Sequence, residues 1–462
     1  MFISRNDGIR MTPLDRLPAG LSERLKAAAG IVEKHDSFLL ISHYDADGIS
    51  SAQIVRETLA RKGKKSRTII YPTLSVEQMD RTRVLKAECV IMTDLGTSYL
   101  DDLASMNWDI VILDHHGIPE DAEIPSRSGF VFANPMEFGI NGSANACASA
   151  MAYLFSLAVD GKNTDLAPLA MAGMFGDSQN YGGFESVDLD IVESAVSGGT
   201  VRRFTDLAYP TGLTFYQAMM SCPDPYQVGT TGRADKVTRF IKSCELAMTD
   251  MPNTVSQERI DAFAEALASR MRRAGVTEEI IADTFGDRYF SERYQMDVSI
   301  LASILDGCGR RGNHDMAFAA CDSMDFTEAL LESQAYDESL IESIEEMSGK
   351  VTDLRNIRYF VTDREGLAGN TARAIVRYLG DPEKPVVGVT LTEGRTDLSS
   401  RGTDHQLSMG LNLSLAMRDV CAQFGGQGGG HAIAAGGTIP KGREKEFLEA
   451  LDRYIGGQFG KR

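Results

Sequence analysis

The fold of this chain is decided by the stretch Asp109-Ile110-Val111-Ile112-Leu113-Asp114-His115-His116. Its first five residues form a short, mostly apolar run that is typical of a buried strand. The Asp-His-His triplet therefore begins where the strand ends. Because ligands of open α/β sheets bind beyond the carboxyl ends of the strands, the triplet marks a candidate binding site.

Two earlier segments repeat this arrangement of a strand-like run followed by acidic or histidine residues. Residues 38–42 are followed by His43-Tyr44-Asp45-Ala46-Asp47-Gly48, and residues 89–93 are followed by Asp94-Leu95-Gly96. A lone Asp after a strand is usually a helix N-cap or a turn residue. Three such strand ends together instead predict a convergent metal site, and carboxylate with imidazole suits Mn, Fe or Zn better than Ca.

The spacing of these residues suggests roles for individual side chains. Asp45 and Asp47 are expected to point to one side of a strand-like or loop segment, or to bracket two adjacent ions. Asp94 is a candidate bridge, because the two oxygens of a carboxylate can hold two ions about 3.5–4 Å apart. His115 would provide a nitrogen ligand, and Asp177, at the end of an expected helix, would provide a further oxygen.

The chain as a whole is predicted to be α/β with three parts. Residues 1–200 alternate strand-like and helix-like segments, which indicates a parallel-sheet domain. Residues 201–350 carry few strand signals and predict a mostly helical insertion or linker. Residues 351–462 return to alternating segments and predict a smaller α/β domain.

Composition argues against several classes of protein. The 462 residues, 43% of them apolar, include no run near ~20 uninterrupted apolar residues, so neither a transmembrane helix nor a membrane partner is expected. Residues 1–7 lack the basic-then-apolar pattern of a signal peptide. The seven cysteines form no Cys-x-x-Cys pair, which argues against a disulfide framework or structural zinc and favours the reducing cytoplasm.

The net charge of −18, from 47 basic and 65 acidic residues, counts against a nucleic-acid-binding protein. Net charge governs solubility and long-range steering, however, and a local groove can still be positive. Candidate basic patches are residues 61–67, Arg270 with Arg272 and Arg273, and residues 310–311. The ordinary interpretation of each patch is a solvated helix or loop face.

These motifs resemble those of the DHH phosphoesterases. The four matching motifs are His43-Tyr44-Asp45-Ala46-Asp47-Gly48, Thr93-Asp94-Leu95-Gly96, Asp114-His115-His116 and Gly176-Asp177. The C-terminal stretch Gly428-Gly429-Gly430-His431-Ala432-Ile433-Ala434-Ala435-Gly436 resembles the signature of the DHH-associated domain, which an alanyl-tRNA synthetase domain shares. The resemblance spans almost the whole chain and implies a parallel-sheet DHH domain, a smaller C-terminal domain and an active-site cleft between them.

The resemblance also implies site residues in the first domain. The matching family metal ligands are Asp45, Asp47, Asp94, His115 and Asp177. His116 matches a histidine that contacts the scissile phosphate or assists the leaving group, and Asp114 matches a carboxylate that orients its neighbours. His43 is expected at the metal site without a fixed role, because bacterial RecJ has Asp at the matching position and other members place a ligand histidine where this chain has Ile41.

In the C-terminal domain the resemblance implies contacts with substrate. Ser400 and Arg401 lie in a strand-like segment, where the guanidinium can bind a phosphate with two hydrogen bonds. The backbone of Gly429 and Gly430 would approach a phosphate closely, and His431 would hydrogen-bond the same group. The alternative is that these glycines only form a tight turn between a helix and a strand.

Within the family, the long helical stretch between the two domains resembles the RecJ-like nucleases of archaea. The resemblance therefore implies a single-strand-specific exonuclease of DNA or RNA, acting in replication or repair, with two divalent cations, Mn²⁺ or else Mg²⁺, and GINS or the replicative helicase as a partner. A scaffold subunit that binds GINS is one alternative. Another is a phosphodiesterase of short oligonucleotides or cyclic dinucleotides, although those enzymes join their domains by a short linker.

Overall fold

The computed structural model describes residues 12–72, 74–83, 85, 87–119 and 122–460. By its internal contacts the chain divides into two compact units, Met1–Arg203 with Tyr289–Ala329, and Phe204–Arg288 with Leu330–Arg462. The stretch 201–350, predicted as an insertion or linker, therefore contributes to both units.

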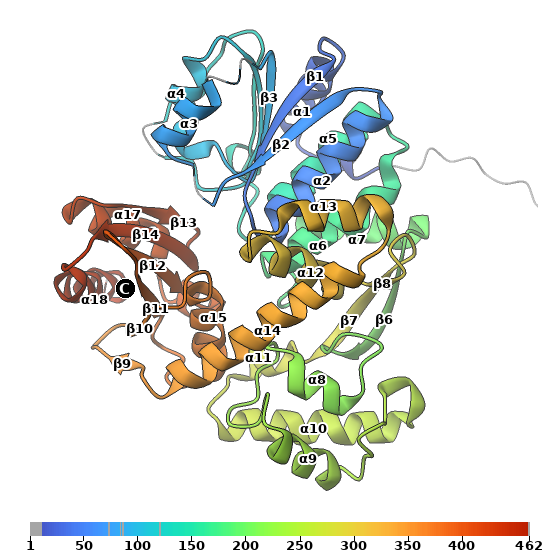
Figure 1. The fold of residues 1–462 in the computed structure, drawn as a ribbon, viewed down its shortest axis with the longest axis vertical. Coiled ribbons are helices and arrows are strands. Elements are labelled where there is room, and N and C mark those ends of the chain that lie inside the picture. Colours follow the sequence, from blue (N-terminus) through green and yellow to red (C-terminus); the bar gives the residue numbers. More distant parts are fainter. Residues whose placement is uncertain (1–11, 73, 84, 86, 120–121, 461–462) are drawn as a thin grey trace, which may run out of the picture. The chain divides into compact units, whose positions relative to one another are not determined.

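The first unit is built on a five-stranded parallel sheet, as the sequence predicts (Figure 1). Its strands, in spatial order, are β2 (Lys65–Ile70), β1 (Ser37–Ser42), β3 (Cys89–Thr93), β4 (Asp109–Leu113) and β5 (Phe130–Ala133). The predicted strands before His43, Asp94 and Asp114 are confirmed to within one residue at each end. Strands β3 and β4 are buried along almost their whole length, which explains why they read as continuous apolar runs.

Helices cover both faces of this sheet, so alternate residues of each strand enter different cores. On one face, Ile91 and Val111 pack with residues of α1 (Ala19–Val32), α2 (Ala46–Arg61) and α5 (Ala148–Val159). On the other face, Met92 and Ile112 pack with residues of α3 (Val76–Arg83) and α4 (Leu100–Ala104). The result is a three-layer arrangement in which both sheet faces are apolar.

The register of the sheet places the candidate site residues in one row. Ser42 is paired with Thr93, and Thr93 with Leu113, so these three residues end their strands at the same level. The residues that follow them, His43, Asp94 and Asp114, therefore leave the sheet together at its carboxyl edge.

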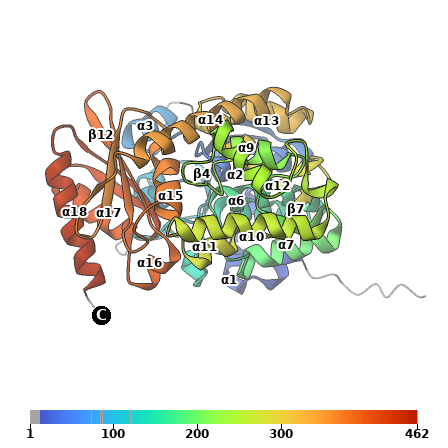
Figure 2. The same cartoon turned by 90° about the horizontal axis from the view of Figure 1, so that it is seen from below.

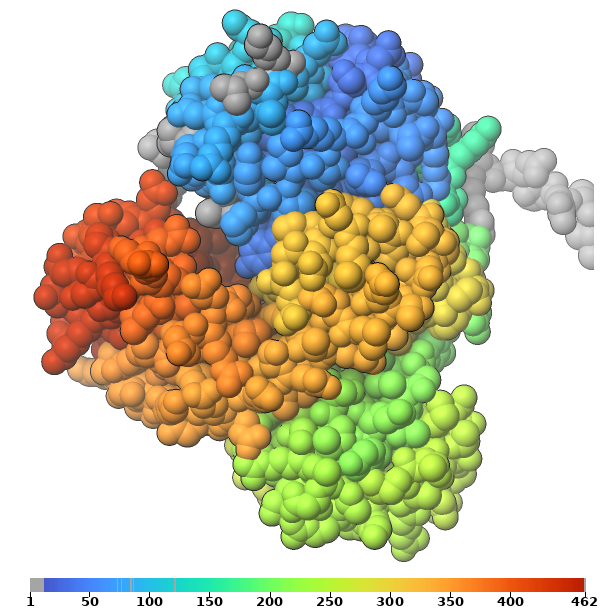
Figure 3. Space-filling model, viewed as in Figure 1, coloured from blue at the N-terminus to red at the C-terminus, as the bar shows by residue number. Residues whose placement is uncertain are grey.

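Four further helices complete the first unit: α6 (Ala167–Gly176), α7 (Ser186–Gly198), α12 (Val298–Arg310) and α13 (His314–Ser323). Helix α13 lies against α2 although about 260 residues separate them, and in Figure 3 golden residues of this later part of the chain adjoin blue residues of the N-terminal part. Asp322 accepts hydrogen bonds from Gln53 Nε2 at 2.7 Å and from an Arg56 nitrogen at 3.1 Å.

The second unit combines a helical part with a mixed sheet. The helical part contains α8 (Phe215–Ser221), α9 (Ala234–Ser243), α10 (Gln257–Arg273), α11 (Glu278–Ala282) and most of α14 (Thr327–Ser348). Helices α10 and α14 are the longest of these, and both lie in the stretch that was predicted to be mostly helical. Phe215, Phe263 and Tyr336 belong to the apolar core that these helices share.

The six-stranded sheet has the order β13-β14-β12-β11-β10-β9, and only β10 and β11 are parallel. Its strands are β9 (Thr352–Asp353), β10 (Arg358–Thr362), β11 (Val386–Leu391), β12 (Arg395–Arg401), β13 (Gln427–Gly430) and β14 (Ala434–Pro440). Helix α15 (Ala368–Tyr378) packs on one face, and α17 (Leu413–Gln423) with α18 (Glu444–Phe459) on the other (Figure 2). A short helix, α16 (Asp404–Ser408), follows β12.

A third, smaller sheet was not predicted. It consists of β6 (Val201–Leu207), β7 (Phe285–Ser291) and β8 (Met296–Asp297), in that order. β6 has charged or polar residues at most positions, and β8 has only two residues, so neither produces an apolar run. Among the described residues, no helix combines the length and the apolar character needed to span a bilayer.

We predict that Gly309→Ala destabilises the protein. A Cβ at Gly309, in α12, would lie 1.7 Å from the backbone oxygen of Tyr44, so either the helix or the segment before α2 would have to move. Overpacking of this kind typically costs about 1–3 kcal/mol. Chemical denaturation would measure this loss as a lower unfolding midpoint.

Gly30→Ala is the matched control for this substitution. Gly30 is exposed on α1, and an added Cβ there would meet no atom within 4 Å. Because alanine favours helix over glycine by about 1 kcal/mol, this variant should be as stable as the parent or more so. A Gly309→Ala protein with parental stability would contradict the packing described here.

Candidate metal centre

Asp45 and Asp47 occupy the first turn of a helix rather than the strand-like or loop segment that we expected. Asp45 is the N-cap of α2, and its side chain accepts a hydrogen bond from the Gly48 amide at 3.1 Å. The helix begins here because an N-cap aspartate satisfies an amide that has no partner within the helix. Gly48 is required at this turn, since a Cβ would lie 2.4 Å from the His43 backbone oxygen.

Asp47 is completely buried and held by the start of a second helix. Its two carboxylate oxygens accept hydrogen bonds from the amides of Ala148 and Ser149, each at 2.8 Å, at the N-terminus of α5. Helix N-termini favour negative charge, so this contact stabilises an ionised carboxylate. Gly173 of α6 permits the close packing, because a Cβ there would lie 2.5 Å from Asp47 Oδ1.

Asp94 stands between two groups of potential ligands. Its backbone has a φ of 58°, an uncommon value for a residue other than glycine, and its amide donates to the Leu113 oxygen at 3.1 Å. The side chain is 3% exposed. Its Oδ2 faces His43, whereas its Oδ1 faces His115. Each carboxylate oxygen therefore belongs to a different group.

The first group consists of His43, Asp45 and Asp94. His43 Nδ1 lies 3.0 Å from Asp45 Oδ2 and 3.4 Å from Asp94 Oδ2. The other ring nitrogen, Nε2, donates to the backbone oxygen of Pro72 at 3.1 Å. Histidine ligands of metals typically donate their second ring N–H in this way, which turns the free nitrogen toward the ion.

The second group consists of Asp47, His115 and Asp177, with the other oxygen of Asp94. His115 Nε2 lies 3.2 Å from Asp94 Oδ1, 3.4 Å from Asp177 Oδ2 and 3.6 Å from Asp47 Oδ2. Its Nδ1 donates to the Gly142 backbone oxygen at 2.8 Å. Asp177 is the C-cap of α6. The potential ligand atoms of His43, Asp45 and Asp94 lie within 4.8 Å of one another, and so do those of Asp47, His115 and Asp177, a spacing that can hold a metal ion.

Asp114 and His116 form a pair beside these groups. Asp114 Oδ2 accepts from the amide and the hydroxyl of Thr97 at 2.9 and 2.7 Å. Its Oδ1 accepts from the His115 amide at 2.8 Å and from His116 Nδ1 at 2.8 Å. The side chain of His116 is 34% exposed, whereas that of His115 is 1% exposed. Thus Asp114 fixes the ring of an accessible histidine.

The charges in the site raise the pKa values of two histidines and lower the pKa values of two aspartates. Burial by itself would lower the pKa of His43 and of His115, but the surrounding carboxylates raise both pKa values well above the usual one. Burial would raise the pKa of Asp45 and of Asp114, but the nearby imidazoles hold both well below their usual range. Without a cation, protons on the two imidazoles therefore offset part of the carboxylate charge.

Burial and neighbouring negative charges raise the pKa values of three other carboxyl groups near the site. Burial and the Asp94 carboxylate raise the pKa of Asp47 to about 6, and burial with the Asp47 charge raises the pKa of Asp177 well above its usual value. Asp188, in the first turn of α7, is also fully buried, and its pKa is raised by burial and by Asp47. Additional positive charge at this site would relieve these interactions.

Several residues of the site were not predicted from the sequence. Asn134 follows β5 and donates to Thr97 Oγ1 at 3.2 Å and to the His116 backbone oxygen at 2.9 Å. The same strand-end argument that selected Asp94 would have found Asn134. Gln179 donates to the Gly142 oxygen that also holds His115, and nothing in its local sequence indicates this contact.

Arg310 was predicted only as part of a basic patch, but it lies next to the metal-site loop. Its guanidinium stacks over the Tyr44 ring at 5.4 Å and pairs with Asp306 at 2.6 Å. Asp306 in turn accepts from the Ala46 amide at 3.3 Å. The side chain of Arg310 is 12% exposed, so the prediction of a solvated face is wrong here.

The predicted substrate residues of the C-terminal domain gather at one end of its sheet. Ser400 and Gly430 both pair with Ala435 of β14, and the Ser400 hydroxyl donates to the Ala435 oxygen at 2.9 Å. Arg401 is the last residue of β12, and His431 directly follows β13. The glycines, Gly429 included, lie in strand β13, so the alternative of a simple helix-to-strand turn is wrong.

Comparison with known families agrees with this architecture. Residues 37–174 match the model of the DHH family N-terminal domain, and residues 356–457 match that of the DHHA1 domain. The chain is 29% identical over 452 residues to the uncharacterized protein MJ0831 of Methanocaldococcus jannaschii. This match covers 95% of this chain and 98% of the relative.

Solved structures with the same fold include CDC45 from Entamoeba histolytica, with a TM-score of 0.65, 10% identity and coverage of 95% of this chain and 99% of that one. RecJ from Thermus thermophilus, in complex with Mn²⁺, has a TM-score of 0.57 and 14% identity over 94% of this chain. This chain spans 55% of that RecJ, which has also been solved with Mg²⁺ at a TM-score of 0.51.

At these identities the structural matches show the fold, and the two family models identify the domains. The candidate ligands lie in the first matched segment or shortly after it, and the glycine-rich strand lies in the second. The chain therefore carries the two domains of the DHH family, an N-terminal DHH domain and a C-terminal DHHA1 domain.

Proposed function

We propose that this protein is a metal-dependent exonuclease that hydrolyses single-stranded DNA or RNA to mononucleotides. The observation that carries the proposal is the position of Asp94, whose two oxygens face two separate ligand groups. Four carboxylates and two imidazoles suit two divalent cations, Mn²⁺ or else Mg²⁺. The RecJ structures that hold Mn²⁺ and Mg²⁺ support this choice of metals.

Two divalent cations, when bound, would neutralise the phosphodiester and activate a water for attack on phosphorus. The protein would contribute the fixed positions of their ligands. The hydrogen bonds from His43 to Pro72 and from His115 to Gly142 hold each ring with one nitrogen directed at the carboxylates. The amides of α5 hold Asp47 in the same way. Such preorganisation avoids reorganising the site during the reaction.

His116 is suited to proton transfer to the leaving oxygen. Its Nδ1 is engaged by Asp114, so a proton donated to substrate would come from Nε2. The Asp114 carboxylate orients the ring, and Asn134 holds the backbone of the same residue. We infer that His116 donates from Nε2 to the scissile phosphate or to the departing alkoxide, while Asp114 acts as a positioning residue.

Binding of the nucleic-acid backbone requires donors outside the metal centre. Arg310, beside Tyr44 and Asp45 and paired with Asp306, places a guanidinium charge next to the metal centre in the first unit. In the DHHA1 domain we propose that Ser400, Arg401, Gly429, Gly430 and His431 contact substrate phosphates. The support for these five is their common position at the ends of neighbouring strands and the match to the family.

A second candidate function is a scaffold subunit of the replication machinery that binds GINS. The similarity to CDC45 over 95% of this chain favours it. A scaffold has no need for a complete ligand set, however, and each residue that matches a family metal ligand lies in one of the two ligand groups here. We therefore place hydrolysis first.

We predict that Asp94→Asn and His116→Gln each abolish hydrolysis of labelled single-stranded DNA or RNA with Mn²⁺ present. Asn removes the charge that both ligand groups share, and Gln removes the proton donor, whose contribution is typically ~100-fold or more. Release of mononucleotides would be measured across single-stranded DNA, RNA, duplex DNA, dinucleotides, cyclic dinucleotides and pyrophosphate.

His405→Gln is the matched control, because His405 is partly exposed and pairs with Glu383 in the DHHA1 domain. It should retain parental activity. Parental rates in both site variants would refute the assignment of the site. No hydrolysis of any substrate by the parent, with metal bound, would favour the scaffold.

We also predict that Mn²⁺ binding releases protons and strengthens as the pH rises. The raised pKa values of His43 and His115 mean that both rings are protonated in the metal-free protein at neutral pH, whereas a metal ligand must be neutral. Each proton displaced makes the affinity rise about tenfold per pH unit until the raised pKa is passed.

Calorimetric titrations at pH 7 in two buffers of different ionisation enthalpy would count these protons. His115→Gln should release fewer protons than the parent, and His405→Gln should release the same number. Binding enthalpies that do not depend on the buffer would contradict the predicted protonation of the metal-free site.

A further inference from the structure

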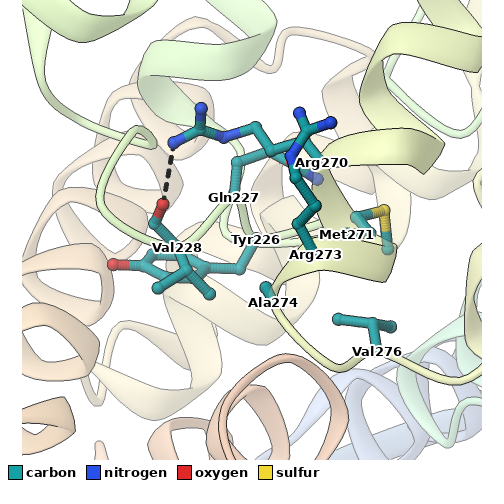
Figure 4. Close-up of a pocket in the computed structure, with 8 residues that line it drawn as sticks. All are labelled: Tyr226, Gln227, Val228, Arg270, Met271, Arg273, Ala274 and Val276. Carbon is teal, nitrogen blue, oxygen red and sulfur yellow. Dashed lines mark hydrogen bonds between the residues drawn. The ribbon is translucent and has the colours of Figure 1, made fainter.

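A pocket of about 260 Å³ lies in the helical part of the second unit, and none of the residues assigned so far lines it. Its walls come from the end of α10 and from the segment that includes Tyr226, Gln227 and Val228 (Figure 4). Two arginines of α10, Arg270 and Arg273, lie on one side of it. Both belong to a basic patch that the sequence predicted and that the proposed nuclease activity does not use.

The three arginines of that patch have different kinds of partners in the structure. Arg272 is paired with Glu265 at 3.0 Å and with Glu278 at 2.7 Å. Arg270 and Arg273 have no carboxylate partner among the residues that the structure describes. Arg270 donates to the Val228 oxygen at 3.1 Å and to the Thr230 hydroxyl, and Arg273 donates to Ser269 Oγ at 2.9 Å. The two charges at the pocket are therefore uncompensated.

This arrangement is costly without an anion. Burial and the neighbouring charge of Arg273 both lower the pKa of Arg270, which shows that its cationic form is disfavoured here. A concave site lined by charges of one sign concentrates counter-ions. An anion bound between the two guanidinium groups would reverse the unfavourable interaction.

The hydrogen-bonding groups left unused at the pocket are donors. Arg270 Nε and Gln227 Nε2 are both buried, and within the described part of the chain neither has a partner. Gln227 is only 1% exposed. Buried donors are normally satisfied, so a ligand rich in acceptors is the complement of this surface. Val228, Met271 and Val276 add an apolar wall for an organic group.

We propose that this pocket binds a phosphate monoester, with the phosphate on Arg270 and Arg273 and a small organic body against the apolar wall. A phosphate monoester carries close to two negative charges at neutral pH, which matches two guanidinium groups better than one carboxylate does. The volume is just below the ~300 Å³ at which sites for larger ligands begin, which suits a mononucleotide.

The test is calorimetric titration of the full-length protein, with Mn²⁺ and again after chelation, so that the metal centre is separated from this pocket. The ligands are AMP, inorganic phosphate and a 5′-phosphorylated single-stranded oligonucleotide. The variants are Arg273→Gln, with Arg272→Gln as the matched control. Thermal unfolding of each variant verifies that it is folded, and hydrolysis of single-stranded DNA checks that the metal centre is unaffected.

We expect saturable binding after chelation that weakens about tenfold or more in Arg273→Gln, as for loss of one charge-assisted hydrogen bond, and is unchanged in Arg272→Gln. If AMP binds more tightly than phosphate, the ligand is a mononucleotide, and if the two bind equally, the ligand is free phosphate. If the oligonucleotide binds most tightly, the ligand is the phosphorylated end of a strand. No binding of any of the three, or equal weakening in both variants, would overturn the proposal. Neither result bears on the nuclease activity.

Discussion

The repulsion among the carboxylates around Asp94 is the constraint on which the rest of the first unit depends. Four carboxylates converge on two imidazoles, and like charges in a buried site are expensive unless they are compensated. The fold supplies fixed donors for this purpose, such as the α5 amides at Asp47 and the Thr97 groups at Asp114. The rest of the negative charge must be compensated by protons or by bound cations, so the stability of the fold is linked to metal binding.

The strands that deliver these residues could be predicted from the sequence because each is a short apolar run with a polar end. The same reasoning placed Asp45 and Asp47 near the site but in the wrong conformation, since an N-cap aspartate and a loop aspartate look alike in sequence. The contact of Arg310 with Tyr44 could not be predicted. It depends on the packing of α12, about 260 residues away along the chain, which no local pattern records.

The alternative interpretation of the C-terminal glycines, a tight turn, failed for a related reason. Gly428 to Gly430 predict a turn by composition, since glycine is depleted in strands. They form β13 because neighbouring segments come unusually close: a Cβ at Gly428 would lie 2.6 Å from the Met417 backbone oxygen of α17. The partners of the basic patch around Arg272 likewise depend on the three-dimensional structure, because among the described residues only one of its arginines is paired with acids.

The central claim is that Asp94 holds two cations at once. Anomalous diffraction at the manganese edge, from crystals of the full chain grown with Mn²⁺, tests it most directly. The account predicts two peaks about 3.5–4 Å apart, one beside His43 and Asp45 and the other beside His115 and Asp177, with Asp94 between them. A single peak that Asp94 does not contact, or manganese bound elsewhere, would contradict it.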